Sequence, residues 1–477
     1  MLTQAQEAIL EQIIEAFQNG KRLTDLPDAT GSNPFDFLVE VSENGESKKA
    51  VLASMLPYVE QQCAYGIEFS TSVSSPTCTR IGSTDLHKSL PVQSRMKGVL
   101  LDDNGAIVEY LQPQGWQDQV RDGSKGQVMV EIPAHYRKFV TDGVKRQVWL
   151  SEVPLPGYHL VPKMYVSAYE ATEDRTNHKL ASVVNLTAQY RGGDNSSGND
   201  GTYKSYLGRP ASNISLTDFR TKARARKANS TEWNCMTYDV HKSLYWLFVV
   251  EYATLNTQKA YNGELDANGF RQGGLGDGVT TASSYWAYFN GSHPFVPCGT
   301  TDALGNGTGV VDYTFEIDGN GTEKTVHVPR YRGVENPFGH INQWTDGILV
   351  QAHPASGENV NKVFVCSDPS KFSSTSIANY THVGNQSRTS NSYITKVIFG
   401  EGGEIIAEEA GGSASTYFCD TNYTAVPESN IELRGVLFGG FADVGSGAGF
   451  ACASSSAAPS GTSSHFGSRL CFIPATA

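Results

Sequence analysis

The pattern of hydrophobic and polar residues predicts a helix at the start of the chain and short strands through much of the remaining sequence. Thr3 is placed to cap the first helix, with Gln6 three residues later, and Gly20 is placed to end it. The apolar face of this helix consists of Ile9, Leu10, Ile13, Ile14 and Phe17. Such a stripe needs a partner, which is either the rest of the chain or the same helix in neighbouring subunits.

Two early segments have the pattern of β-hairpins. Phe35–Leu52 places FLVEV and KKAVL around the polar turn SENGE, and Val99–Leu111 turns at a DDNG motif. Similar motifs, DANG and DGNG, occur near Asp266 and Asp318. All three lack the later ligands and the closing Glu of a calcium loop, so we expect plain hairpin turns at these places.

From Gln127 onwards the chain alternates as strands do, and two helices interrupt this pattern. Ser215 is an N-cap with Asp218 at the third helical position, which predicts a helix through the basic run RTKARARK. We expect that run to form a solvated face. The second helix is apolar nearly all round from Leu244 to Val250, so it should be central and buried, with Glu251 as a structural hydrogen-bond partner.

The remainder of the chain is rich in glycine and aromatic residues and shows no helix of ordinary length. The predicted fold class is therefore α+β: an N-terminal helix and small β modules, then a domain with two helices and irregular β structure.

The C-terminal run from Arg434 to Pro474 has an unusual composition. Between Phe441 and Phe466 it contains no Lys, Arg, Glu, Gln, Met or Trp and is mostly Ala, Ser and Gly. Hydrophobic segments close it at both ends, which a disordered tail would not need. The anchors are Val436, Leu437, Phe438, Leu470, Phe472 and Ile473. We therefore expect a binding surface held on a rigid frame.

Composition narrows the function classes. The chain has 477 residues and a formal net charge of −12, which gives no electrostatic footprint for nucleic acid or for an anionic membrane. The first residues lack the pattern of a signal peptide, and no apolar run is long enough to cross a bilayer. The eight cysteines form no CxxC pair, so we expect no disulfide framework, no metal site and no cofactor.

Several separated segments resemble the C-type-lectin-like fold shared by formylglycine-generating enzymes and the variable proteins of diversity-generating retroelements. These segments are Tyr165–Thr172, Arg209–Ser215 with its helix, Trp233–Glu251, the FGHINQWTDG stretch Phe338–Gly347, Arg434–Phe438 and Phe466–Leu470. The resemblance covers roughly Gln127 to Pro474. It implies three regions: 1–65 for attachment or oligomerisation, 66–126 as a β-rich spacer or trimerisation region, and 127–477 as the ligand-binding domain.

Within this fold the sequence departs from the enzymes. The formylglycine-generating enzymes bind copper through two cysteines a few residues apart, whereas Cys419, Cys452 and Cys471 are widely spaced. The related iron sulfoxide synthases need an H-x-x-x-H-x-E element, and the chain has none. No G-x-S-x-G elbow supports a serine nucleophile. We therefore expect that the chain is not an enzyme.

The C-terminal run is more similar to the diversified repeats of retroelement variable proteins, such as the phage major tropism determinant and tail-associated proteins of phages of gut bacteria. In that family, asparagine codons are randomised at adenines, which cannot yield Lys, Glu, Gln, Met or Trp. The resemblance places the variable region at about 438–470. It implies a fixed scaffold of Gly439, Gly440, Gly445, Gly449, Pro459, Gly467, Arg469 and Leu470.

The positions between these scaffold residues are the expected ligand-binding residues. They are Phe441, Asp443, Val444, Gly447, Phe450, Cys452, Ser454, Ser456, Ala457, Gly461, Ser463 and His465. Their side chains should point outward, so that random substitution leaves the fold intact. Phe441, Phe450 and His465 are the expected anchors, because aromatic side chains give large contact area at small entropic cost.

The resemblance implies a phage receptor-binding protein at a tail fibre or baseplate tip. It would be assembled in the bacterial cytoplasm, reside in the virion as a homotrimer, and contact other tail proteins and a protein or glycan receptor on the host surface. Two alternatives stay open: a variable ligand-binding protein displayed on a bacterial surface, and an oxidoreductase similar to formylglycine-generating enzymes.

Overall fold

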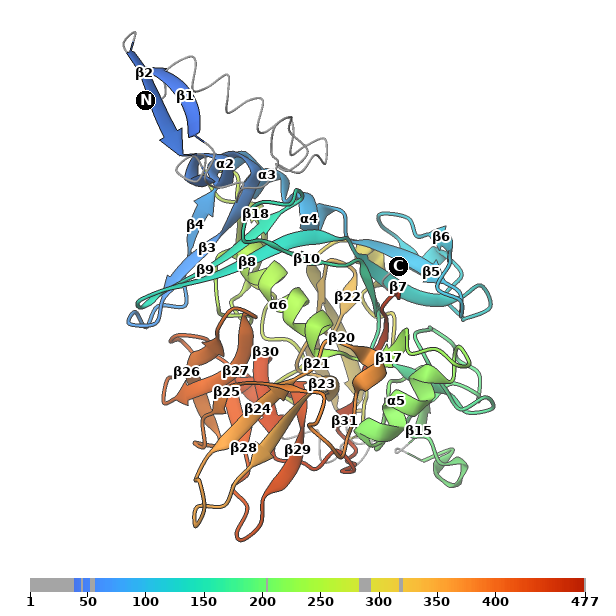
Figure 1. Cartoon of the computed structure of the whole chain (residues 1–477). Coiled ribbons are helices and arrows are strands. Elements are labelled where there is room, and N and C mark those ends of the chain that lie inside the picture. The colour runs from blue at the N-terminus through green and yellow to red at the C-terminus, as the bar shows by residue number, and fades with distance from the viewer. Residues whose placement is uncertain are drawn as a thin grey trace.

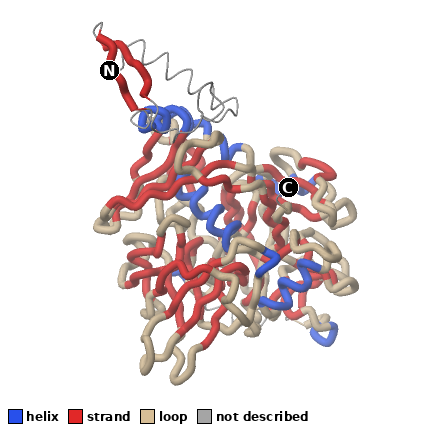
Figure 2. The backbone as a smooth tube through the Cα atoms, in the orientation of Figure 1, coloured by secondary structure: helices blue, strands red, loops and turns tan. Residues whose placement is uncertain are grey.

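The computed structural model describes residues 38–43, 46–51, 56–202, 205–282, 293–316 and 321–475. Strands dominate the fold and helices are few, so the α+β class is confirmed (Figures 1 and 2). The hairpin expected over Phe35–Leu52 is present as β1 (Leu38–Glu43) paired antiparallel with β2 (Glu46–Val51). The expected first helix and the DGNG turn near Asp318 lie outside the described residues.

A five-stranded sheet with the order β10-β8-β9-β3-β4 forms the upper part of the molecule in Figure 1. Its strands are β3 (Ala64–Ser70), β4 (Thr79–Gly82), β8 (His135–Asp142), β9 (Lys145–Ser151) and β10 (His159–Val161). Two short helices, α2 (Leu56–Cys63) and α3 (Thr84–Ser89), contact β3, and α4 (Pro91–Ser94) comes after α3.

A six-stranded sheet with the order β17-β32-β11-β7-β5-β6 joins early, middle and C-terminal parts of the chain. Its strands are β5 (Lys97–Leu101), β6 (Ile107–Tyr110), β7 (Gln127–Ile132), β11 (Met164–Ser167), β17 (Trp233–Cys235) and β32 (Leu470–Phe472). The predicted hairpin over Val99–Leu111 is β5 with β6, and the Asp102 carboxylate accepts hydrogen bonds from the backbone of Asn104 and Ala106 in its turn.

These two sheets overturn the expected division into regions. The boundary after Gly126 is wrong, because β5 before it pairs with β7 after it along the whole of Lys97–Leu101. The boundary after Tyr65 is wrong as well, because it falls inside β3, which pairs with β9. Residues 66–126 are therefore built into the same sheets as the later residues, and they do not form a separate spacer.

Both predicted helices are present. Helix α5 (Leu216–Arg224) is capped by Ser215, whose Oγ accepts a hydrogen bond from the Asp218 backbone N–H at 3.1 Å. Helix α6 (Tyr238–Tyr252) lies between the sheets, with the run from Leu244 to Val250 entirely buried (Figure 1). At its end the Glu251 carboxylate accepts hydrogen bonds from Tyr331 and Arg332, in agreement with a structural role.

The basic run at the end of α5 contains two arginines that are buried in ion pairs, so the prediction of a solvated face is wrong. Arg220 is 8% exposed and pairs with the buried Asp346, and Arg226 is 7% exposed and pairs with Asp103. These carboxylates come from distant strands and turns, so the residues around the helix contain no sign of them. The arginines hold α5 against the neighbouring sheets.

The C-terminal half forms a nine-stranded sheet with the order β25-β24-β23-β29-β30-β28-β26-β27, to which β31 adds beside β23. The Ser387 N–H, just beyond β25, donates to the Ala407 carbonyl in β27 at 2.8 Å, so the two ends of the sheet meet. Its strands are β23 (Asn342–Ala352), β24 (Asn361–Val365), β25 (Thr381–Gln386), β26 (Ser392–Phe399), β27 (Glu404–Ala410), β28 (Thr421–Thr424), β29 (Glu432–Gly439), β30 (Gly449–Ser455) and β31 (Phe466–Gly467).

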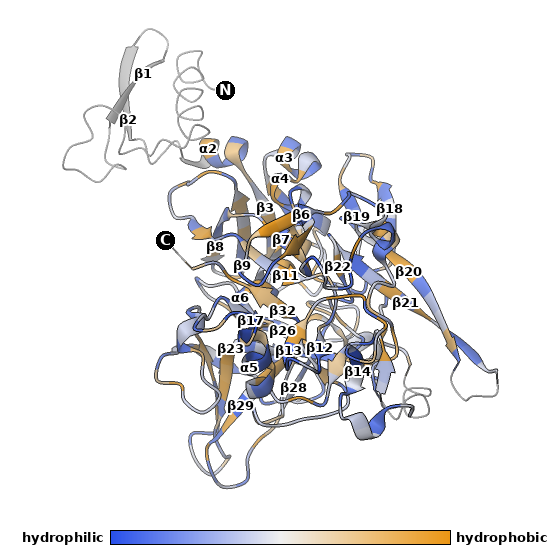
Figure 3. Ribbon diagram, turned by 90° about the vertical axis from the view of Figure 1, so that its right-hand side faces the viewer, coloured by the Kyte–Doolittle hydropathy of each residue, from blue (hydrophilic) through white to orange (hydrophobic). Residues whose placement is uncertain are grey.

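Small sheets and hairpins fill the space around these layers. They comprise β12 (Thr172–Asp174), β13 (Lys179–Ala181), β14 (Arg191–Asp194), β15 (Ser205–Leu207), β16 (Ala211–Ser212), β18 (Tyr261–Leu265), β19 (Arg271–Gly273), β20 (Gly309–Glu316), β21 (Glu323–Tyr331) and β22 (Val334–Glu335). The β20–β21 hairpin projects from the body of the molecule in Figure 3. Its buried Phe315 and Val326 pack with Ala442 of the C-terminal run, so this hairpin borders that run.

Candidate functional site

The C-terminal run is an ordered part of the fold at both ends. β29 pairs with β23 and β30, and β32 pairs with β11 and β17. The expected anchors Val436, Leu437, Phe438, Leu470 and Phe472 are at most 3% exposed. We name residues 438–470, where the resemblance places a variable region, the variable segment. The expected burial of hydrophobic anchors at both ends is therefore present, although the sixth anchor, Ile473, is only half-buried.

Arg469 is the centre of that frame. Its side chain is fully buried, and its guanidinium donates to the carbonyl oxygens of Ser167, Glu335 and Asn336. It also donates to Oε1 of Gln343 at 3.1 Å. Burial lowers the pKa of Arg469, and the carboxylates of Glu170 and Glu335 oppose this shift. The Arg469 side chain thus contacts two segments that are distant in sequence, one at Ser167 and one from Glu335 to Gln343.

Two glycines of the frame are required by close packing. A Cβ on Gly449, whose φ is 150°, would collide with the Asp420 carboxylate, and a Cβ on Gly467 would collide with Ile341. Gly439, Gly440 and Gly445 have φ values of 96°, 74° and 62°, in the left-handed region that favours glycine. Pro459 is buried, and its carbonyl accepts the first N–H of α5 at 3.1 Å. The scaffold assignment agrees with these contacts.

Sequence reasoning missed Asp420, which supports the same frame from the chain preceding β28. Its buried carboxylate accepts the Ala451 N–H at 2.7 Å, and burial raises the pKa of Asp420 well above its usual range. The other oxygen, Oδ1, has no hydrogen-bond partner among the described residues. Asp420 therefore holds the start of β30 by accepting a backbone hydrogen bond, which favours the ionised carboxylate and opposes the pKa increase that burial causes.

Three of the expected ligand-binding residues come together at the surface. The ring of Phe441 stacks on that of His465 with centroids 4.2 Å apart, and Ser463 Oγ lies 2.9 Å from His465 Nδ1. All three side chains are partly exposed. Burial lowers the pKa of His465 to about 4, so its imidazole is neutral at physiological pH. We name Phe441, Ser463 and His465 the aromatic patch.

The remaining accessible positions lie around other parts of the segment. Asp443 is exposed. Burial raises the pKa of Tyr423, whose strand pairs in register with Ser454, and the charge of Asp443 adds to this increase. Val444 and Gly461 are half-buried. Ser456 and Ala457 lie at the end of β30, where their carbonyls accept from Arg434 and from the Gly435 backbone. The accessible positions therefore include the aromatic patch and further positions outside it. Backbone hydrogen bonds hold Ser456 and Ala457 in place.

Phe450, Cys452 and Gly447 do not point outward, and the prediction that they do is wrong. Phe450 is fully buried against α6, where its carbonyl accepts from His241 Nε2 at 2.7 Å and its ring packs on Phe248. Cys452 is 2% exposed. The physical reason is that β30 is buried from Gly449 to Ala453, where α6 packs across it, and that Gly447, which precedes β30, packs against Thr421. Phe450 is a core residue and cannot anchor a ligand.

A fixed group of side chains adjoins the aromatic patch. Tyr206 and Tyr313, from β15 and β20, pack against the same hydrophobic cluster as Phe441. Arg209 lies between these tyrosines, with its Cζ 5.7 Å and 5.9 Å from the two ring centroids. The sequence does not predict that these side chains come together. The segments that carry Arg209, Tyr313 and Phe441 are each separated by more than a hundred residues, and only the tertiary fold brings them to one cluster.

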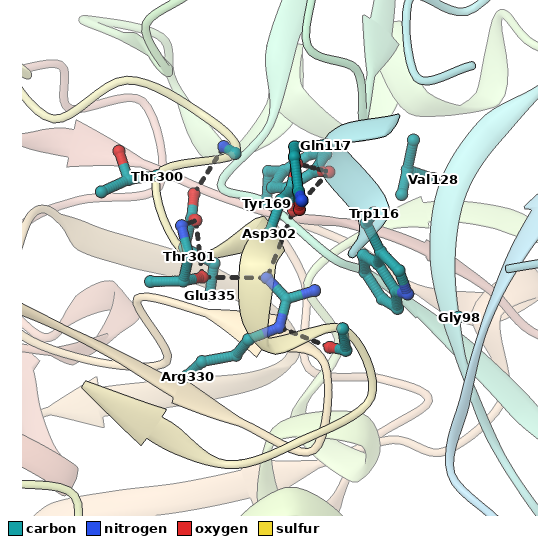
Figure 4. Close-up of polar contacts among 12 residues, drawn as sticks. Gly98, Trp116, Gln117, Val128, Tyr169, Thr300, Thr301, Asp302, Arg330 and Glu335 are labelled. Atoms are coloured by element: carbon teal, nitrogen blue, oxygen red, sulfur yellow. Dashed lines mark hydrogen bonds and ion pairs between the residues drawn. The ribbon is translucent and has the colours of Figure 1, made fainter. Parts of the chain in front are cut away.

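Behind the site lies a buried charged network (Figure 4). Arg330 lies over the Trp116 ring at 4.2 Å and contacts Asp302, which also accepts from the Tyr169 hydroxyl. Glu335 accepts hydrogen bonds from Thr301, and burial raises its pKa to about 7. The side chains of Arg330 and Asp302 are 0% and 1% exposed. The network is sealed from solvent, and it reaches the frame through the Glu335 carbonyl that binds Arg469.

Among the described residues, no group of three or more His, Cys, Asp and Glu side chains is arranged to hold a metal ion. The eight cysteines are free, and burial raises the pKa of the Cys452 and Cys471 thiols. Within the described part of the chain, no helix has the length and apolar character needed to cross a membrane. A scan against protein-family models finds no match to this sequence, and a search of curated proteins finds none either.

Proposed function

We propose that this chain is a phage receptor-binding protein that adsorbs to the host bacterial surface through a retroelement-diversified site on a C-type-lectin-like domain. The observation that carries the proposal is that the variable segment contains two groups of residues, one buried and one accessible. Arg469, Gly449 and Gly467 are fixed by burial and close packing, whereas Phe441, Ser463 and His465 are accessible. A site with this organisation tolerates substitution of the accessible residues, because few core contacts depend on them.

The backbone around the accessible residues is held from outside the segment. The Asn342 N–H donates to the His465 carbonyl and the Asn213 N–H donates to the Ser463 carbonyl, both at 2.9 Å. The Ala442 N–H donates to the His340 carbonyl at 3.2 Å. These bonds do not depend on which side chains the variable positions carry. They therefore support a loop whose shape survives diversification.

The placement of the ends also fits a tail-tip protein. In Figure 1 the five-stranded sheet, built from early parts of the chain, lies at the upper end of the molecule, and β31, which follows His465 of the aromatic patch, lies toward the lower end. On this proposal the N-terminal part contacts other tail proteins and the variable segment faces the host. Assembly as a homotrimer, repeated over several fibres, would raise avidity without requiring a tight individual site.

The proposal is tested by binding of the labelled full-length protein to a panel of bacterial strains. We expect wild-type protein to bind at least one strain. The double variant Phe441→Ala with His465→Ala should lose at least tenfold in affinity, since it removes the two aromatic faces of the patch. The matched control is Tyr110→Ala, which removes a 52% exposed tyrosine from β6. Binding to no strain, or equal losses in both variants, contradicts the proposal.

The diversification itself has a separate genomic test. The neighbouring DNA should contain a near-copy of the coding region for Phe438–Leu470, differing mainly where the copy has adenines, beside a reverse transcriptase gene. If such a copy is absent, the accessible positions are not diversified, although a fixed receptor-binding surface would remain.

A further inference from the structure

Arg209 differs from the other arginines around it. Arg191, Arg220 and Arg332 each pair with a carboxylate, of Asp200, Asp346 and Glu251 respectively. Arg209 has no carboxylate within ion-pairing distance among the described residues, and its one hydrogen bond goes from Nη2 to the Tyr313 hydroxyl at 3.2 Å. Its Nε is buried without a partner in that part of the chain. A partly exposed guanidinium is thus positioned without an anion of its own.

The tyrosines hold this guanidinium in place. Both tyrosine rings lie within cation–π range of Arg209, and the Tyr313 hydroxyl accepts a hydrogen bond from Nη2, so the guanidinium is restricted before any ligand arrives. Four residues after Arg209, the Asn213 backbone N–H donates to the Ser463 carbonyl of the variable segment. Phe441 packs on the same cluster as both tyrosines. Arg209 is therefore linked to the aromatic patch through the two tyrosines and through Asn213, and it lies outside residues 438–470.

We infer that Arg209, Tyr206 and Tyr313 form a constant subsite that binds a carboxylate on a protein receptor, next to the diversified positions. The inference rests on the proposed receptor-binding function. Because Nε is buried, the guanidinium would bind a carboxylate end-on, through two parallel hydrogen bonds from Nη1 and the remaining N–H of Nη2. Arg and Tyr are the residue types that dominate binding energy at protein interfaces. Their setting among Ser, Gly and Asn resembles the composition of antibody binding loops, which favours a protein partner.

This subsite gives the diversified surface a fixed point of attachment. Each new set of variable residues would start from the same charge-assisted contact and would need to supply only the remaining complementarity. Receptors selected by successive variants would then share an exposed acidic residue at the corresponding place.

The test uses full-length protein and a strain that the wild type binds. Arg209→Gln should reduce affinity about tenfold or more, since a charge-assisted contact is lost. Arg209→Lys should lose less, because it keeps the charge without the fork. Tyr313→Phe keeps the ring and removes the hydrogen bond from Nη2, so it should weaken binding by less than Arg209→Gln does. The matched control is Arg146→Gln, because Arg146 also lies over an aromatic ring, that of Phe399, and bonds only to backbone carbonyls among the described residues.

Treated cells identify the receptor chemistry. Protease treatment of the cells should abolish binding, and so should amidation of their carboxylates with a carbodiimide and glycinamide, which leaves phosphates intact. Periodate oxidation of glycans should leave binding unchanged. Binding that resists protease and is destroyed by periodate overturns the inference in favour of a glycan. Unchanged binding to amidated cells overturns it as well, and that arm needs no variant, so it decides even if Arg209→Gln fails to fold.

Failure of this inference is distinguishable from failure of the proposed function. If Arg209→Gln binds as wild type while the Phe441→Ala and His465→Ala double variant does not, the constant subsite is wrong and receptor binding stands. If neither variant changes binding, the proposed site itself is wrong.

Discussion

Replacing Arg469 by Met should cost the protein about 3–5 kcal/mol of unfolding free energy, the range typical of breaking a buried charged contact. The substitution keeps much of the side-chain volume and removes the guanidinium. Three backbone carbonyls and the Gln343 amide oxygen lose their donor. Asn336 O keeps a second donor, Gln343 Nε2 at 3.2 Å, so the main cost falls on the carbonyls of Ser167 and Glu335. Each unsatisfied buried carbonyl costs roughly 1–3 kcal/mol, offset in part because no charge is buried in the variant.

Equilibrium urea unfolding followed by tryptophan fluorescence measures this loss. The matched control is Arg434→Met on β29, where the side chain is 17% exposed and bonds to Ser456 and Glu432. An exposed pair of this kind contributes less than about 1 kcal/mol. Equal losses in the two variants, or a loss below about 1 kcal/mol for Arg469→Met, would refute the assignment of Arg469 as the centre of the frame.

Two further predictions concern the core and the buried network. Phe450→Ala should destabilise the protein by about 3–5 kcal/mol, because it empties a fully buried site, whereas Phe441→Ala should cost only about 1 kcal/mol. Thermal unfolding of both variants measures this contrast, which would be reversed if Phe450 faced solvent. The Glu335 pKa is raised from 4.5 to about 7, so the folded state holds the proton more tightly and unfolding free energy falls as pH rises from about 4.5 to 7. Glu335→Gln should remove about 1 kcal/mol per pH unit of this slope, measured as the difference between urea titrations of the two proteins at several pH values, and an unchanged slope would contradict the role of Glu335.

The predictions that succeeded rest on local signals. The Ser215 cap, the apolar run of α6 and the Asp102 turn each depend on residues within one or two helical turns or one hairpin, and each is present in the structure. The C-terminal anchors belong to the same class, since a segment that ends on strand-like hydrophobic residues must bury them somewhere. For the same reason the variable segment is recognisable as ordered from its own residues, without knowledge of its neighbours.

The sequence by itself determined the α+β class, the positions of the two long helices and the existence of a framed C-terminal segment. Only the tertiary structure decided that β30 is buried from Gly449 to Ala453, which places Phe450 and Cys452 in the core. It also brought Arg209 to Tyr206 and Tyr313, which pack on the same cluster as Phe441, and merged residues 66–126 into common sheets. The physical reason is that the hydrogen bonds of helix caps and turns are made with neighbours in sequence. The ion-pair partners of Arg220 and Arg226, by contrast, are more than a hundred positions away.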